Sequence, residues 1–164
     1  MQLLLSFLLL SIAHVCLGQS TFALKVSSTD DSLNGKYLAP LYQDEHMSYG
    51  YFVDTPGALF YLDNGDMKMV SADGARVRID VDGDLASLVQ ISSFVERGGD
   101  FSLGDNNNLE LDGVDYFFMA CNNTELVTPR QYPEWILAYY TPYINHDWCV
   151  ASTHVYAEFM GAGP

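Results

Sequence analysis

Residues 101–124, FSLGDNNNLELDGVDYFFMACNNT, carry most of the information about how this chain folds. Apolar and polar residues alternate over 101–103 and again over 109–111, with a Gly-Asp-Asn-Asn-Asn break between them. A period of two is typical of a half-buried β-strand. The pair Asp112-Gly113 then predicts a tight hairpin, because a type I′ turn needs positive φ at both central residues.

The end of the same stretch indicates a cellular compartment. Residues 114–120 are apolar almost throughout, as in a strand that is covered on both faces, and Cys121 follows them. Asn122-Asn123-Thr124 is an N-x-Thr acceptor, which is used only on a secreted chain. We therefore predict that Asn122 is glycosylated.

The N-terminus predicts secretion independently. Residues 1–18, MQLLLSFLLLSIAHVCLG, contain an apolar run over 3–10 and neutral residues toward Gly18. This is the pattern of a secretory signal peptide, too short for a spanning helix. Cleavage after Gly18 would leave residues 19–164, about 146 residues, which suits one domain. We expect a secreted protein, extracellular or in a cell wall, with no membrane association after signal removal.

The cysteines predict one disulfide. Cys16 leaves with the signal, so Cys121 and Cys149 remain as an even pair in an oxidising compartment. The alternative is two free buried thiols.

The charge is strongly acidic, with 21 Asp and Glu against 7 Lys and Arg and a net charge of −14. Such a surface repels nucleic acid and anionic membranes, and it favours a soluble monomer. A cationic partner, such as a partly deacetylated amino-sugar polymer of a cell wall, would be attracted. Plain solubility in an acidic medium explains the charge equally well.

The best-specified hairpin spans residues 58–70. With Asn64-Gly65 as a two-residue I′ loop, Phe60 faces Met69 and Leu62 faces Met67, so the apolar pairs fall on one side. Asp63 and Asp66 then oppose each other at the rim, where a solvated turn explains them better than a calcium site does.

Repeated strand and turn patterns along the chain predict an all-β domain of about eleven short strands. They include an apolar strand over 134–141 and a last strand over 148–160. We expect a compact antiparallel β-sandwich or a small β-barrel. A trefoil-like fold is the alternative, since Phe60-x-Leu62, Phe101-x-Leu103 and Trp135-x-Leu137 recur about forty residues apart.

No pattern indicates an enzyme, a metal site or a cofactor. His146 and His154 flank Cys149, but their spacing matches no zinc motif and the cysteine has a disulfide partner. The chain has no Gly-x-Ser-x-Gly elbow. A hydrolase using a carboxylate pair stays open as an alternative, because such a pair has no sequence signature.

Two aromatic residues are candidates for a glycan-binding surface. Tyr143 and Trp148 lie in a predicted loop beside Asn145, His146 and Asp147. Tyrosine and tryptophan rings stack on sugars while their polar tips tolerate water. Packing in the core or at its rim is the alternative. These residues keep a secreted carbohydrate-binding module or host-interacting effector open as a second function.

Several motifs resemble one known family, the PhiA-type secreted cell-wall proteins of filamentous fungi. They are Phe60-Tyr61-Leu62-x-x-Gly65-x-Met67-x-Met69, Phe101-x-Leu103, Asn108-Leu109-x-Leu111-x-Gly113, Phe118-Met119-Ala120-Cys121-Asn122, Trp135-x-Leu137 and Cys149. The resemblance covers roughly residues 58–158 and implies a glycosylated, wall-associated protein linked to conidium-forming cells, without established enzymatic activity. Cell-wall polysaccharide is then the expected partner.

Overall fold

A computed structural model of the chain describes a set of β-strands and one short 3-10 turn. The residues described are 20–42, 47–71, 75–79, 87–93, 99–114, 118–122, 135–139, 149–150 and 153–160. The elements are β1 (Phe22–Ser28), β2 (Tyr37–Tyr42), β3 (Met47–Val53), β4 (Phe60–Asp63), β5 (Asp66–Met69), β6 (Arg76–Ile79), β7 (Ser87–Ser92), β8 (Phe101–Leu103), η1 (Asp105–Asn107), β9 (Leu109–Leu111), β10 (Phe118–Asn122), β11 (Trp135–Tyr139), β12 (Cys149–Val150) and β13 (Thr153–Phe159).

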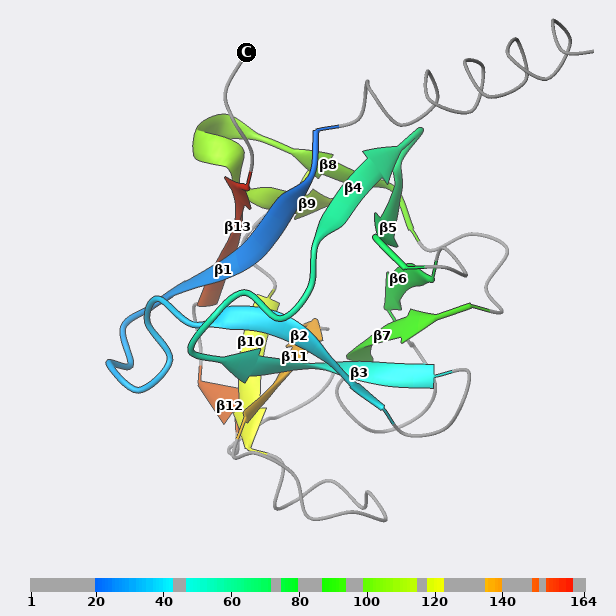
Figure 1. Cartoon of the computed structure of the whole chain (residues 1–164). Coiled ribbons are helices and arrows are strands. Elements are labelled where there is room, and N and C mark those ends of the chain that lie inside the picture. The colour runs from blue at the N-terminus through cyan, green and yellow to red at the C-terminus, as the bar shows by residue number, and fades with distance from the viewer. Residues whose placement is uncertain are drawn as a thin grey trace, which may run out of the picture.

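Within these described residues, seven antiparallel strands close into a barrel. The order around it is β1-β2-β3-β7-β6-β5-β4, and β4 returns to β1 through the pair Phe60–Phe22 (Figure 1). Closure leaves no exposed edge within the ring. The predicted all-β fold is confirmed, in the form of a small barrel with additional strands.

The remaining strands add to the outside and to one end of the barrel. β13 pairs with β1 along its whole length, and β11 pairs with β3 and β7 and carries β10 and β12. β8 and β9 form a separate two-stranded sheet. The amide of Phe101 in β8 donates to the carbonyl of Gly65, 2.7 Å away, which attaches this small sheet to the β4–β5 turn.

The main core contains side chains from the barrel strands, from β10, β11 and β13, and from the added sheet. Phe22, Phe60 and Phe118 are its largest fully buried side chains. Phe101 and Leu109 of the β8–β9 sheet belong to the same cluster. The added hairpin therefore shares the core of the barrel.

The β4–β5 hairpin has the predicted turn and the predicted register. Asn64 and Gly65 have φ values of 53° and 86°, both positive as a I′ turn requires. Phe60 lies opposite Met69 and Leu62 opposite Met67. The opposed carboxylates at the rim are compensated, because the Lys68 ammonium pairs with Asp63.

The predicted turn at Asp112-Gly113 is also confirmed, with φ values of 54° and 76°. The strand that follows this turn has different pairing partners from those that a simple hairpin predicts. Leu111 and Val114 exchange two backbone hydrogen bonds of 3.0 and 3.1 Å, but β10 pairs with β11 and β12 instead of continuing beside β9. As predicted, β10 is covered on both faces: its first four residues, Phe118 to Cys121, are buried.

Two other details of the prediction are wrong. The last predicted strand, 148–160, is two strands with different partners, since β12 pairs with β10 and β13 pairs with β1. The three similar segments do not occupy equivalent places, as a trefoil repeat requires. Phe60 lies in the barrel, Phe101 in the separate sheet and Trp135 in a strand outside the ring.

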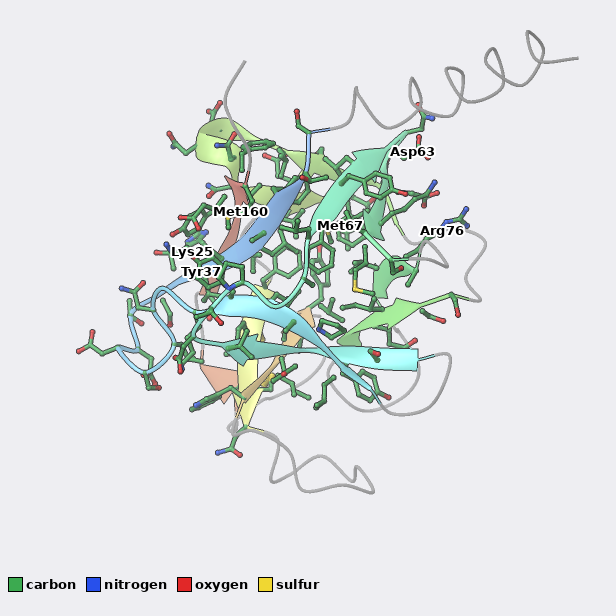
Figure 2. All side chains as sticks on the ribbon, viewed as in Figure 1. Lys25, Tyr37, Asp63, Met67, Arg76 and Met160 are labelled. Carbon is green, nitrogen blue, oxygen red and sulfur yellow. A yellow bond between two sulfur atoms is a disulfide. The ribbon has the colours of Figure 1, made fainter. Side chains whose placement is uncertain are left out.

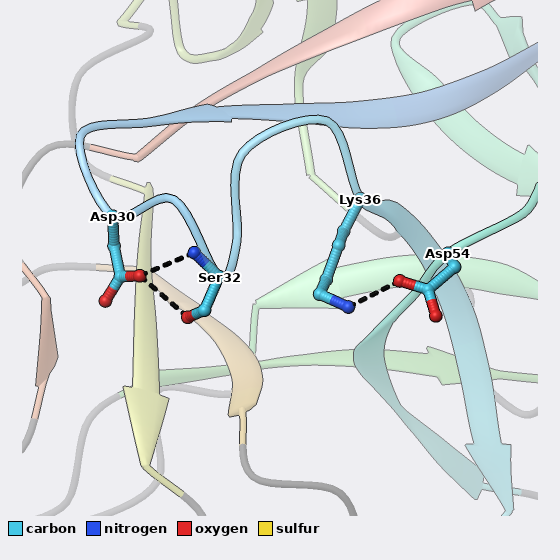
Figure 3. Close-up of polar contacts among 4 residues, drawn as sticks. All are labelled: Asp30, Ser32, Lys36 and Asp54. Carbon is cyan, nitrogen blue, oxygen red and sulfur yellow. Dashed lines mark hydrogen bonds and ion pairs between the residues drawn. The ribbon is translucent and has the colours of Figure 1, made fainter.

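Local polar contacts stabilise the connection from β1 to β2. The Asp30 carboxylate accepts hydrogen bonds from the Ser32 amide at 2.8 Å and from the Ser32 hydroxyl at 2.7 Å (Figure 3). These two bonds lower the pKa of Asp30. Beyond the turn, the Lys36 ammonium lies 2.6 Å from Asp54 Oδ1, which ties the start of β2 to the residue after β3.

Candidate functional site

The predicted disulfide between Cys121 and Cys149 is present in the structure. The two residues lie directly opposite each other on β10 and β12, and their separation is 28 residues. Cys121 is fully buried, while Cys149 is half-buried. The bond thus joins two strands that the pairing already places side by side.

The disulfide belongs to a second, smaller apolar cluster on the outer side of β10 and β11. Its buried members are Met119, Cys121, Ile136 and Ala138. Tyr51 of β3 and Cys149 pack against it and are themselves half-buried. Alternate residues of β10 and β11 therefore face two different cores.

Asn122, the predicted glycosylation site, ends β10. It lies opposite Trp135 on β11, and it is half-buried. The other two residues of its acceptor motif, Asn123 and Thr124, lie outside the described residues. Glycosylation of Asn122 stays a prediction.

Two other predictions concern residues outside the described part of the chain. They are the glycan-binding residues Tyr143 and Trp148 and the signal peptide at 1–18. Both stay predictions.

A connected group of polar side chains on the described surface lies over β13, β1 and β2. Glu158 accepts a hydrogen bond from the Lys25 ammonium at 3.0 Å on one carboxylate oxygen and from the Tyr37 hydroxyl at 2.5 Å on the other. The Lys25 nitrogen lies 5.1 Å from the centre of the Tyr37 ring (Figure 2), which is within the range of a cation–π contact. We call Lys25, Tyr37, Glu158 and Tyr156 the tyrosine face.

Tyr156 belongs to this face by register. It lies opposite Lys25 on β13, while Tyr37 lies opposite Lys25 on β2. Directly opposite residues of antiparallel strands point to the same side of a sheet. The three side chains therefore form a row, Tyr156–Lys25–Tyr37, across three strands.

Both charged groups of the tyrosine face are held in their ionised forms. The hydrogen bond from Tyr37, and then the one from Lys25, lowers the pKa of Glu158. The hydrogen bond with Glu158, followed by the contact with Tyr37, raises the pKa of Lys25. The face carries one positive and one negative charge across the physiological range.

A comparable group lies over β4, β5 and β6. Tyr61 is opposite Lys68, and Lys68 is opposite Arg76. Lys68 pairs with Asp63, and the Arg76 Nε atom lies 3.8 Å from Asp66. This group has one tyrosine in its row where the tyrosine face has two.

Within the part of the chain that the structure describes, no group of three His, Cys, Asp or Glu side chains is placed to hold a metal ion. Among the same residues, no helix has the length and apolar character needed to span a membrane.

The tyrosine face was not identified from the sequence. Tyr37 and Glu158 are 121 positions apart and Lys25 and Glu158 are 133 apart, so only the strand pairing brings them together. The one signal in the sequence is the alternation over residues 22–26, which puts Lys25 on the face opposite Phe22, Leu24 and Val26. No protein-family model matches this chain, and the comparisons with curated proteins and with solved structures found no match.

Proposed function

We propose that this chain is a secreted, non-enzymatic protein of a fungal cell wall, linked to conidium-forming cells. The observation that supports the extracellular part of the proposal is the Cys121–Cys149 disulfide between paired strands. Disulfides persist mainly in oxidising compartments outside the cytosol. The leader-like N-terminus, the Asn122 acceptor motif and the resemblance to PhiA-type proteins support the same location and role.

Two of the described carboxyl groups do not fit the proton donor of a glycosidase. A glycosidase acid needs a raised pKa so that it is protonated at the start of the reaction. Asp30 and Glu158, the described residues with a resolved carboxyl shift, both have a lowered pKa, caused by hydrogen bonds from Ser32 and Tyr37 respectively. Both are acceptors in a local network and are poor proton donors.

Fractionation of a producing fungal culture tests the location. We expect the protein in wall extracts, with the mass deficit of one disulfide and with a glycosidase-sensitive mass increment on Asn122. A protein found only in culture fluid, or one with two free thiols, would contradict the proposal. Turnover of any member of a polysaccharide substrate panel would contradict the non-enzymatic part alone.

A further inference from the structure

We propose that the tyrosine face binds a neutral polysaccharide of the cell wall. Tyr37 and Tyr156 stack on sugar rings, and Lys25 and Glu158 form hydrogen bonds with the hydroxyl groups of the sugar. The proposal deepens the wall association proposed above and rests on it for its choice of ligand.

The spacing of the tyrosines suits a chain of linked rings. Tyr156 and Tyr37 lie on strands that flank β1, and Lys25 lies between them in register. Neighbouring strands are about 4.8 Å apart, so the two tyrosines start roughly 10 Å apart on one side of the sheet. A ligand that contacts both must extend across the strands, as an oligosaccharide does.

The polar groups between the tyrosines fit hydroxyl groups. A carboxylate accepts hydrogen bonds and an ammonium donates them. Glu158 can therefore accept from the O–H of one sugar hydroxyl while Lys25 donates to the oxygen of a neighbouring one. The pair remains accessible, because the side chains of Lys25 and Glu158 are 23% and 37% exposed. Tyr37 and Tyr156 are half-buried residues. The Lys25 ammonium lies over one face of the Tyr37 ring, so a sugar would stack on the other face.

Charge distinguishes a neutral ligand from a cationic one. The two charges of the tyrosine face cancel, whereas the whole chain has a net charge of −14. A cationic amino-sugar polymer would be attracted by the overall charge at any acidic patch, and salt would weaken that attraction. Binding at the tyrosine face depends on stacking and hydrogen bonds and should change little with salt.

Co-sedimentation of the full secreted protein with insoluble β-glucan, with chitin and with the cationic polymer chitosan tests the proposal. We expect the wild type to enter the pellet at both low and high salt. The changes Tyr37→Ala and Tyr156→Ala should each weaken binding roughly three- to tenfold, the range expected for loss of one aromatic contact. The matched control is Tyr61→Ala, because Tyr61 also lies opposite a lysine that is paired with an aspartate. It should bind as the wild type does.

Three results would overturn the proposal. The first is that the wild type binds neither β-glucan nor chitin. The second is that the wild type and both face variants bind equally. The third is that the wild type binds only a cationic polymer and that salt abolishes this binding.

Tyr37→Phe controls for loss of binding through misfolding, because it keeps the ring and loses only the hydroxyl bond to Glu158. It should retain most of the binding.

A measurement on the unmodified protein avoids substitutions altogether. Titration with a soluble β-glucan or chitin hexasaccharide should shift the amide NMR signals of residues 23–25, 37 and 156–158. Shifts confined to other residues would show that the tyrosine face is not the binding site.

Retention in fungal walls separates this proposal from the proposed function. If the wild type and both variants are retained equally in walls, the tyrosine face is not the binding site and the proposed function stands. If the protein binds purified glucan through this face but is absent from walls, the face stands and the proposed function is wrong.

Discussion

The interior of the barrel and the small cluster outside it are both apolar, but they are assembled differently. The interior draws on β1 to β11 and on β13, and two of its largest side chains, Phe22 and Phe60, are at most 1% exposed. The outer cluster has four buried members in the described residues, all from β10 and β11, and one of them is a disulfide cysteine. Burial alone can stabilise the first, whereas the second combines burial with a covalent bond.

The difference follows from the area that each cluster removes from water. Burying a large apolar side chain contributes about 1.5–3 kcal/mol, so an interior built from many such side chains accumulates a large stabilisation. Ala138 and Cys121 are small, and they bury little area each. A bond between Cys121 and Cys149 adds about 3–4 kcal/mol by restricting the unfolded chain over 28 residues.

The largest effect should come from the barrel interior. Phe60→Ala removes a fully buried ring that links β4 to β1, and we expect a loss of about 3–5 kcal/mol in the free energy of unfolding. Denaturant titration measures it. Val70→Ala is the control, since Val70 is 52% exposed and should change stability by less than about 0.5 kcal/mol. Similar losses of unfolding free energy in the two variants would refute the assignment of Phe60 to the barrel interior.

The next effect should come from the disulfide. Replacing Cys121 and Cys149 together by alanine should cost about 3–4 kcal/mol. Hydrogen exchange should accelerate most in β10 and β12, while the β1–β13 ladder keeps its protection. Uniform acceleration of exchange throughout the barrel would show that the outer cluster and the interior unfold as one unit. The two clusters would then not differ in what stabilises them.

The two I′ turns give a smaller, matched pair of effects. Gly113→Ala places a methyl group in open space at φ +76°, so it should cost about 1 kcal/mol from backbone strain alone. Gly65→Ala should cost about the same, because the atom nearest to its Cβ, Asp100 Oδ1 at 2.4 Å, ends an exposed side chain that can turn away. A clearly larger loss for Gly65→Ala in thermal unfolding would mean that Asp100 is held in place.

The smallest effect should come from the tyrosine face. Its groups are partly exposed, so Glu158→Gln should cost less than about 1 kcal/mol at neutral pH. The pKa of Glu158 is lowered from its ordinary 4.5, so its contribution is present above that pH and is lost as the pH falls below it. The pKa of Lys25 is raised from 10.5, so the contribution of Lys25 persists until the pH rises beyond that value. A wild-type advantage that grows toward acidic pH would refute this network.

Features that depend on neighbouring residues were predictable from the sequence. The Asn64-Gly65 turn and the Phe60–Met69 pairing follow from turn chemistry and alternation within ten residues. The covered faces of β10 and β11 follow from their continuous apolar runs. The disulfide follows from the parity of the cysteines that remain after the predicted cleavage.

Features that depend on distant pairing were not predictable. Alternation predicts a strand but does not say which strand lies beside it. The pattern of residues 148–160 therefore predicts one strand, although β12 and β13 have different partners. The Tyr156–Lys25–Tyr37 row depends on the same long-range register. Its members lie in three strands, two from near the start of the chain and one from its end.

The β class, two tight turns, the burial of two strands on both faces and the cysteine pair follow from the amino-acid sequence, because each depends on local backbone preference or on composition. Closure of the strands into a barrel, the second cluster outside it and the meeting of Lys25, Tyr37 and Glu158 emerge only in the folded chain. Those outcomes depend on which distant segments share hydrogen bonds, and that choice is made by the packing of the whole chain at once.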